Sequence, residues 1–332
     1  MKAAFITQTG PPDVITYGDL PDPRPGRCQC LVRVGAVAVN PIDVYVRGGM
    51  IAGPPVFPLI LGRDLAGTVL EVGPGVKRFR VGDRVWASNQ GTAGRPGTFA
   101  ELAAVDECWL HPTPAGVADD QMAALALVGL TAHLGLVKHA RLRAGETLFV
   151  NGGSGGVGSC VVQMGRILVA RVIATAGSPA KAATCQELGA DLVINYREED
   201  VPTAIRAFAP GGVSLWWETL RTPDFDRAIP LLAPRGRMIV MAGRDARPVF
   251  PVGAFYTKDC SLLGFAMFNT DARGQRASAA AINRWVSEGR LSARIDRVMP
   301  LSEAAEAHRV QERSTLQGSG ELSGKIVLHP GR

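Results

Sequence analysis

Short apolar runs alternate with helical patterns in the middle of the chain. Between residues 124 and 264 the runs are TLFVNG, RVIATAG, DLVINY, VSLWWE, RMIVMAG and CSLLGF. The segments between them, such as SPAKAATCQELGA, carry apolar residues at helical spacing. Short buried strands that alternate with helices pair in parallel through right-handed crossovers. The pattern therefore predicts an open α/β domain with a parallel sheet over residues 124–264.

The two flanking regions have a different texture. Residues 1–123 contain short strand-like runs, such as CLVRVGAVAV, DLAGTVLEVG and GDRVWA, separated by Gly and Pro turn signals. This pattern predicts an irregular β domain. After residue 264 we expect a helix over ARGQRASAAAINRWVSEG, a strand near IDRVM, a second helix that begins at the capping residue Ser302, and a closing strand at GKIVLH.

A glycine-rich stretch lies where the first predicted central strand passes into a helix. Its residues Gly153, Ser154, Gly155, Gly156, Val157 and Gly158 fit the pattern G-x-G-x-x-G. In a strand-to-helix context this pattern is typical of dinucleotide binding. Gly153 would permit the tight turn, Gly155 the approach of a pyrophosphate, and Gly158 the close packing of helix on strand. A merely flexible glycine loop is the alternative.

The end of the next strand indicates which dinucleotide is bound. NAD-binding enzymes usually place a carboxylate there, for the 2′-OH of the adenosine ribose. Between Gly158 and Lys181 the chain has no Asp or Glu. Ser178 and Lys181 instead offer a hydroxyl and an ammonium to a 2′-phosphate. This favours NADPH as the cofactor, unless Lys181 is an ordinary surface lysine.

Composition agrees with a globular protein of about two domains. The chain has 332 residues, 46% hydrophobic and 20% charged, with a formal net charge of +6. Basic residues are spread along the chain and form no patch, a pattern that does not favour nucleic-acid binding. We see neither a secretory signal nor the ~20 uninterrupted apolar residues of a membrane helix. We therefore expect a cytoplasmic protein that does not insert into a membrane.

Cysteines and histidines suggest no metal site. The six cysteines are scattered, and only Cys28 and Cys30 are close, with no second pair at zinc spacing. The histidines at positions 111, 133, 139, 308 and 329 form no constellation in the sequence. We expect free thiols, histidines in surface or core roles, and no bound metal.

Seven segments together resemble a known family. NPIDVYVRGG, LGRDLAGTVLEVG, VGDRVW, GTFAE, GLTAH, GGSGGVG and GSGELSGKIVL occur in the order found in zinc-independent medium-chain dehydrogenase/reductase proteins of the ζ-crystallin-like NADPH:quinone oxidoreductase type. The resemblance implies a GroES-like β-rich catalytic domain, residues 1–123 with 265–332 returning to it. It also implies a Rossmann doubly wound parallel sheet over 124–264 and a cofactor cleft. Members are usually homodimers or homotetramers that associate through the Rossmann edge strands, here CSLLGF.

The resemblance also bears on zinc. Zinc-dependent relatives carry a cysteine before the early aspartate and a Gly-His-Glu motif after the next loop. This chain has Asn40 and Gly62-Arg63-Asp64 at those places, and the short ASNQGTAGRPG replaces the cysteine-rich lobe. Alcohol oxidation would lack a Lewis acid to hold an alkoxide. Hydride transfer to an electron-poor acceptor is chemically easier.

Site residues follow from the same resemblance. Tyr45 is expected as a donor to the substrate oxygen and Asn40 as an orienting amide, both at the nicotinamide. Asp43 is expected to be structural, paired with an arginine such as Arg63. The further cofactor contacts that it implies are Thr131, Tyr196, Gly243, Phe265 and Met267.

One strand departs from the family pattern. Trp216 and Trp217 are adjacent in SLWWETL, where small or aliphatic residues are usual. Successive strand residues point to opposite faces of a sheet. We therefore expect one indole under a neighbouring helix and the other on the opposite face.

Three functions remain open from the sequence. The favoured one is a metal-independent, NADPH-dependent reductase of quinones. The second is an alkene reductase of the same fold, acting on enones or enoyl thioesters. The third is a cofactor-binding structural or RNA-associated protein with little turnover.

Overall fold

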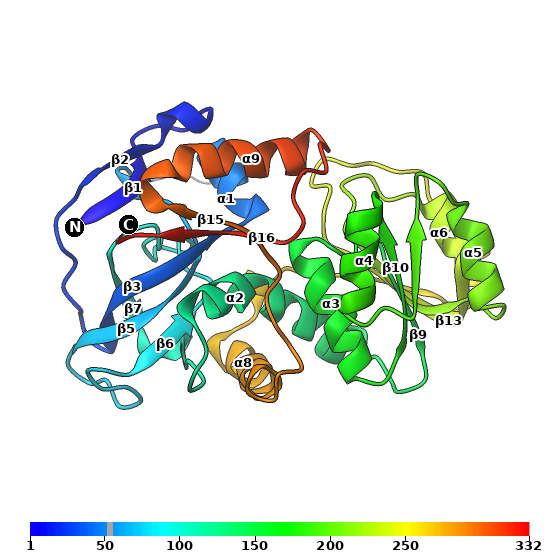
Figure 1. The fold of residues 1–332 in the computed structure, drawn as a ribbon, viewed down its shortest axis with the longest axis horizontal. Coiled ribbons are helices and arrows are strands. Elements are labelled where there is room, and N and C mark those ends of the chain that lie inside the picture. Colours follow the sequence, from blue (N-terminus) through cyan, green and yellow to red (C-terminus); the bar gives the residue numbers. More distant parts are fainter. Residues whose placement is uncertain (52–55, 332) are drawn as a thin grey trace. The chain divides into compact units, whose positions relative to one another are not determined.

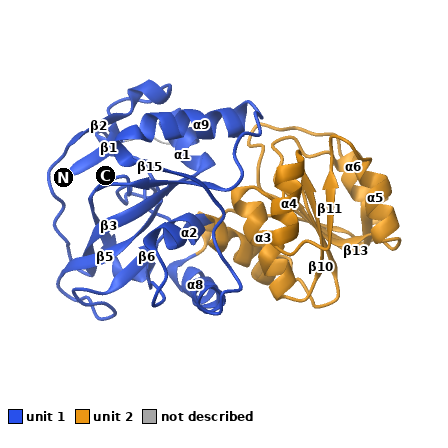
Figure 2. Cartoon of the chain, in the orientation of Figure 1, with its two compact units in different colours: residues 1–127, 271–332 blue, residues 128–270 orange. Residues whose placement is uncertain are grey.

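The chain folds into two compact units in the computed structural model, which describes residues 1–51 and 56–331 (Figure 2). Unit 1 comprises residues 1–127 and 271–332, and unit 2 comprises residues 128–270. The first change of unit falls inside helix α2 (Asp119–His133). The sequence pattern placed the changes near residues 123 and 264. A continuous helix gives no compositional signal at an internal boundary, so the sequence could not locate the first change more closely.

Unit 1 is built around a mostly antiparallel sheet whose longest strand is β3 (Gln29–Val39). The strand order is β15-β16-β3-β5-β6-β8, with β7 also paired to β3. The other strands of this sheet are β5 (Asp64–Val72), β6 (Arg84–Ala87), β7 (Leu102–Asp106), β8 (Leu110–Pro112), β15 (Ile295–Pro300) and β16 (Lys325–His329). A smaller sheet has the order β2-β1-β4, formed by β1 (Lys2–Ile6), β2 (Thr16–Asp19) and β4 (Leu59–Ile60). The β-rich architecture expected of this unit is confirmed.

Unit 1 also contains the helices α1 (Pro41–Arg47), α8 (Ala272–Ser287) and α9 (Ala304–Leu316). Figure 1 shows α1 and α9 side by side, consistent with their contacts. The expected helix start at Ser302 is wrong. Ser302 lies in a 3-10 turn, Leu301–Glu303, and α9 begins after it with Glu303 as its N-cap residue. A preceding 3-10 turn moves the first helical residue without changing the capping pattern of the sequence.

Two histidines lie in the interior of unit 1. His308 on α9 is fully buried, and its ring meets Phe99 edge-on with centroids 6.0 Å apart. Neither ring nitrogen of His308 has a hydrogen-bond partner among residues 1–51 and 56–331. Burial lowers the pKa of His308 to about 3, with a smaller contribution from Arg47. His111 is buried as well, and burial lowers its pKa to about 3.

Unit 2 is the expected parallel sheet. Its strand order is β11-β10-β9-β12-β13-β14, and all five neighbouring pairs are parallel. The bounds are β9 (Thr147–Val150), β10 (Arg171–Ala176), β11 (Leu192–Asn195), β12 (Val213–Glu218), β13 (Leu232–Val240) and β14 (Ser261–Gly264). The order reverses between β9 and β12, and in such sheets ligands bind at the carboxyl ends of the strands beside the reversal.

Helices cover both faces of this sheet. Figure 1 shows α3 (Gly156–Ile167) and α4 (Pro179–Glu187) on one face, and α5 (Val201–Phe208) and α6 (Phe225–Leu231) on the other. A short helix, α7 (Val252–Tyr256), precedes β14. The doubly wound α/β fold inferred from the sequence is confirmed.

The two adjacent tryptophans of β12 face opposite sides of the sheet, as expected. Trp216 stacks on Phe149, with ring centroids 3.9 Å apart, in the core under α5 and α6. Trp217 lies on the other side, against the π-helical segment Leu134–His139. A Cβ atom at Gly135 would lie 2.2 Å from the Trp217 ring. The glycine therefore makes room for the second indole.

Within the described part of the chain, one helix is long and apolar enough to cross a membrane by length and composition alone. It runs from Asp119 to His139, and 72% of its most apolar window is buried inside the protein. Because Asp119, Asp120 and Lys138 lie within it, the segment is not an uninterrupted run of ~20 apolar residues. A core helix of a globular protein passes the same test of length and composition, and the burial is what a core position produces.

Candidate functional site

The glycine-rich turn joins β9 to α3 at the carboxyl edge of the parallel sheet. Gly152 has a φ of +83°, so the left-handed residue of the turn is Gly152 and not Gly153 as the motif suggested. Gly153 is needed for another reason, because a Cβ there would lie 2.7 Å from the Cβ of Ala174. At Gly158 a Cβ would lie 2.1 Å from the carbonyl oxygen of Gly152. Helix α3 can therefore approach the turn only without side chains at these positions.

This turn fits a bound pyrophosphate. Gly155 is the N-cap residue of α3, and a Cβ at Gly155 would find only the Gly152 carbonyl oxygen nearby, at 3.5 Å. Ser154, Gly156 and Val157 complete the turn and the first residues of the helix. The first N–H groups of a helix have no acceptor within it, and the helix dipole makes this end positive. An anionic group can therefore be held here by backbone N–H groups alone.

The end of the neighbouring strand β10 carries polar groups and no carboxylate. β10 ends at Ala176, and Ser178 caps α4 by accepting a hydrogen bond from the Lys181 backbone N–H at 3.4 Å. β11 runs parallel beside β10, with Asn195 opposite Ala176. Tyr196 follows, is about half exposed, and lies over Gly177, where a Cβ would come within 2.3 Å of the phenol oxygen. The structure thus brings Ser178, Lys181 and Tyr196 to one corner of the sheet.

The remaining cofactor residues expected in unit 2 lie on α2, after β13, after β14 and in a 3-10 turn. Thr131 is buried on α2. Gly243 follows β13 with a φ of +76°, and Phe265 follows β14 and stacks on His139 with ring centroids 4.4 Å apart. Met267 begins a short 3-10 turn and is buried. Gly243, Phe265 and Met267 come after the carboxyl ends of their strands, which in a parallel sheet is the same edge as the glycine-rich turn.

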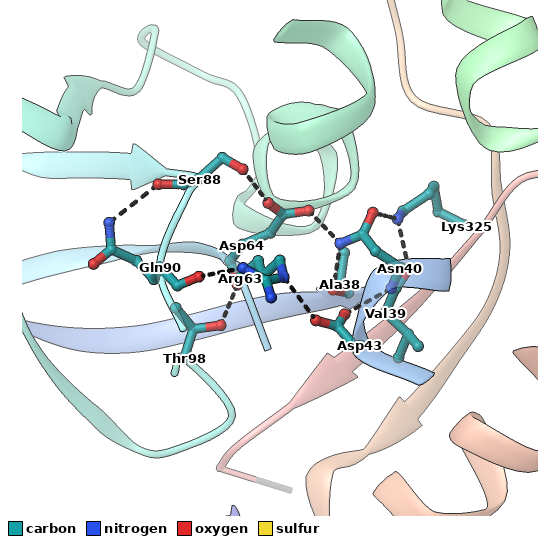
Figure 3. Close-up of polar contacts among 10 residues, drawn as sticks. All are labelled: Ala38, Val39, Asn40, Asp43, Arg63, Asp64, Ser88, Gln90, Thr98 and Lys325. Carbon is teal, nitrogen blue, oxygen red and sulfur yellow. Dashed lines mark hydrogen bonds and ion pairs between the residues drawn. The ribbon is translucent and has the colours of Figure 1, made fainter. Parts of the chain in front are cut away.

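A buried polar cluster in unit 1 contains Asn40, one of the two residues expected at the catalytic centre (Figure 3). Asn40 is fully buried and caps α1. Its side-chain amide donates to Asp64 Oδ2 at 2.8 Å and to the Ala38 carbonyl at 3.2 Å. Its carbonyl oxygen Oδ1 accepts from Lys325 Nζ at 2.5 Å. Asn40 is therefore held by three protein groups, which fixes the orientation of its amide.

Charges of both signs meet in this cluster. Lys325 is buried and also donates to the Val39 carbonyl at 2.5 Å. Asp64 accepts from Ser88 Oγ at 2.6 Å, and burial raises the Asp64 pKa while the Lys325 charge opposes that rise. Lys325 and Asp64 were not predicted as partners of Asn40. The sequence did contain one indication of such a partner. The apolar strand GKIVLH opens with a lysine, and a lysine at a buried strand position needs a counter-charge.

Asp43 pairs with Arg63, as the sequence suggested. Arg63 Nε lies 3.7 Å from Asp43 Oδ1, and Asp43 Oδ2 accepts from the Asn40 backbone N–H at 2.8 Å. Burial raises the pKa of Asp43 to about 6, although Arg63 and the Asn40 N–H act in the opposite direction. Both side chains are buried. Asp43 is thus the structural, α1-capping residue that its position in NPIDVYVRGG implied.

Tyr45 lies on α1, one turn from Asn40, and is partly exposed. A phenol O–H can donate and accept hydrogen bonds. The amide of Asn40, in contrast, is already bonded to Asp64 and Ala38.

The cluster does not fit a zinc ion. Zinc sites in proteins use Cys, His, Asp or Glu ligands in groups of three or four. Across residues 1–51 and 56–331, no three such side chains are grouped so that they could hold a metal. Asn40 and Arg63 are not zinc ligands, and Asp64 is engaged by Ser88 and Asn40.

Comparison with family models matches both units. Residues 26–115 match the alcohol dehydrogenase GroES-like domain, and residues 156–283 match the domain described as zinc-binding dehydrogenase. The first match covers most of the β-rich unit before α2. The second begins at the first residue of α3.

Whole-chain comparisons give the same picture. The chain is 30% identical to the human quinone oxidoreductase over 330 residues, covering 99% of this chain and 97% of the relative. A solved structure of an NAD-dependent alcohol dehydrogenase matches with a TM-score of 0.89 and 31% identity, covering 99% of each chain. The Escherichia coli quinone oxidoreductase complexed with NADPH matches with a TM-score of 0.87 and 25% identity, over 99% of this chain and 100% of that one.

Proposed function

Because the chain belongs to the quinone oxidoreductases of the medium-chain dehydrogenase/reductase family, we propose that it transfers hydride from NADPH to a quinone. The family makes it an oxidoreductase. The observation that carries the choice of cofactor is the corner formed by Ser178, Lys181 and Tyr196, which has a hydroxyl and an ammonium where NAD-binding folds place a carboxylate. The relative from Escherichia coli, solved with NADPH, supports the same choice.

The cofactor proposal predicts an unequal effect of removing one charge. Lys181→Ala is expected to weaken NADPH binding by about 10- to 100-fold, because a charge-assisted hydrogen bond to the 2′-phosphate is lost. NADH has no such phosphate, so its affinity should stay the same. Titration of intrinsic tryptophan fluorescence with each coenzyme gives both dissociation constants.

A second lysine of the same unit supplies the control. Lys138→Ala removes an exposed ammonium outside the proposed phosphate corner and should leave both affinities unchanged. Equal losses for NADPH and NADH in the Lys181 variant would remove Lys181 from the phosphate site.

On the substrate side, we assign different tasks to Tyr45 and Asn40. Tyr45 donates a hydrogen bond to the substrate oxygen, and Asn40 positions α1 through its bonds to Asp64 and Lys325. A donor held near the carbonyl oxygen stabilises the negative charge that develops there as hydride arrives. Bound NADPH supplies the hydride.

Tyr45→Phe is expected to lower kcat by about 10- to 100-fold, because only the phenol O–H is removed. The affinity for NADPH should be unchanged. Steady-state kinetics together with coenzyme titration separates the two effects. Tyr17→Phe, the same change on strand β2, should alter neither quantity, and a Tyr45 variant with full turnover would reduce Tyr45 to a packing role.

We also propose that the reaction needs no zinc. The buried partners of Asn40 are an ammonium and a carboxylate, which neutralise each other without a metal. A quinone or an activated alkene has a carbon that conjugation with its carbonyl groups already makes electron-poor, and this carbon can accept hydride. Reduction therefore does not require the alkoxide stabilisation that alcohol oxidation does.

The test is NADPH oxidation with a panel of quinones and a matched panel of enones, measured by absorbance with and without a zinc chelator. We expect the protein to oxidise NADPH with quinones, and we expect the zinc chelator to leave the rate of that oxidation unchanged. Faster turnover of the enones would instead support the alkene-reductase alternative. Absence of turnover with both panels would contradict the enzymatic proposal and favour a binding role.

A further inference from the structure

A buried carboxylate lies beneath the glycine-rich turn and has no part in the proposed reaction. Glu218 ends strand β12 and is 1% exposed. Its Oε2 accepts from the Trp216 indole N–H at 3.1 Å, and its Oε1 accepts from the Leu220 backbone N–H at 2.8 Å. The Asn151 amide donates to both oxygens, at 2.9 and 3.1 Å. Every neighbour is a donor, as an ionised carboxylate requires.

Asn151 connects this carboxylate to the next strand. It follows β9 directly, and its Oδ1 accepts from Thr175 Oγ1 at 2.9 Å. Its backbone N–H donates to the Trp217 carbonyl at 2.9 Å, and its backbone carbonyl accepts from Thr219 Oγ1 at 2.5 Å. The side chain and backbone of Asn151 are thus paired at both ends, so the residue cannot rotate without breaking several bonds.

Thr175 forms hydrogen bonds with the glycine-rich turn itself. Its Oγ1 accepts from the Gly152 backbone N–H at 2.8 Å, and its backbone carbonyl accepts from the Gly153 N–H at 3.0 Å. An unbroken chain of hydrogen bonds therefore runs from Glu218 through Asn151 and Thr175 to the first two amides of the glycine-rich turn. It links the carboxyl ends of β12, β9 and β10, which are neighbours in the sheet.

Only one direction of donation is possible along this chain. The Glu218 carboxylate accepts from the Asn151 NH₂ group, so the Asn151 carbonyl oxygen faces Thr175. The Thr175 hydroxyl must then donate to Asn151, which leaves its lone pair for the Gly152 N–H. The charge on Glu218 thereby fixes the polarity of each later bond, and the left-handed Gly152 is held in place before any ligand arrives.

From this geometry we infer that Thr175, Asn151 and Glu218 are positioning residues that preset the turn for the pyrophosphate of the cofactor. The inference rests on the proposed NADPH function. A turn ordered in advance binds more tightly, because less conformational entropy is lost on binding. The three residues would act on the dinucleotide as a whole and not on the choice between NADPH and NADH, which lies at the Ser178 corner.

The test uses a matched pair of substitutions at Thr175. Thr175→Val keeps the shape but removes the hydroxyl that joins Gly152 to Asn151, whereas Thr175→Ser keeps the hydroxyl. Calorimetry on the full chain should show Thr175→Val weakening NADPH, NADH and 2′-phospho-ADP-ribose alike, each by about tenfold, since a buried donor and acceptor lose their partner. Thr175→Ser should restore most of that affinity. KM for NADPH should rise while kcat changes little.

The outcomes separate this inference from the function on which it rests. A wild-type protein that binds none of the three ligands would refute the NADPH proposal itself. Wild-type binding combined with equal affinities for the Val variant would overturn the positioning role alone, as would a Ser variant that is as weak as Val. If Thr175→Val does not fold, Glu218→Gln gives the same test. The amide NH₂ of the introduced glutamine would face the donors that now point at the Glu218 carboxylate. Full coenzyme affinity in that variant would also overturn the inference.

Discussion

Lys325→Met is expected to lower the free energy of unfolding by about 3–5 kcal/mol, because it leaves a buried carboxylate without its counter-charge. Lys325 is 4% exposed and its Nζ donates to Val39 and Asn40. Asp64 accepts a hydrogen bond from the side chain of the same Asn40 and is fully buried. Urea titrations followed by circular dichroism give the free energies.

Two further variants make this prediction specific. Lys77→Met removes an exposed lysine of the same unit and should change stability by less than about 0.5 kcal/mol. The double variant Lys325→Met/Asp64→Asn removes both charges and should regain part of the loss, as expected for groups that interact directly. If Lys325→Met alone costs under about 1 kcal/mol, the ammonium does not hold this cluster together.

His308→Leu is expected to make the protein less sensitive to acid. Burial lowers the His308 pKa from 6.5 to about 3, so the unfolded chain takes up a proton at pH values where the folded protein does not. The stability that this neutral imidazole contributes is present above pH 6.5 and is lost as the pH falls toward 3. Between pH 7 and pH 4.5 the loss is about 2–3 kcal/mol for one such group. The variant should lack this part of the decline.

The measurement is the free energy of unfolding of both proteins from pH 4.5 to pH 8. At pH 8 the imidazole is neutral in both states and makes no hydrogen bond in the described part of the chain, so leucine should be at least as stable there. Asp43 acts in the opposite sense, since its raised pKa favours the folded state below about pH 6. It is present in both proteins and cancels from the comparison. If the free energies of unfolding of the two proteins fall in parallel with pH, His308 is not the buried neutral group that makes the protein sensitive to acid.

Local sequence patterns were sufficient for most of the fold. Each of the six apolar runs in the central region corresponds to one strand of the parallel sheet, because a buried strand needs a short continuous apolar segment. The opposite orientations of Trp216 and Trp217 followed from the alternation of side chains along any strand. The pairing of Asp43 with Arg63 followed from their motifs.

The polar networks could not be predicted in the same way. Lys325 and Asn40 are 285 positions apart, and Glu218 and Asn151 are 67 apart. Such partners are brought together by strand order, which no short pattern encodes. The glycine motif gave the location of the turn, but the left-handed residue proved to be Gly152, one position before the motif begins. The backbone conformation depends on the Thr175 hydroxyl of the neighbouring strand as well as on the glycines.

The order of the elements along the chain has a consequence for biosynthesis. Strand β16 pairs with β3 in the middle of the unit 1 sheet and carries Lys325, yet it follows all of unit 2 in the sequence. During translation the parallel sheet can therefore close while the β-rich unit still lacks a central strand. Until β16 has been synthesised, Asp64 lacks the Lys325 ammonium, and the unit 1 sheet lacks the strand that pairs with both β3 and β15.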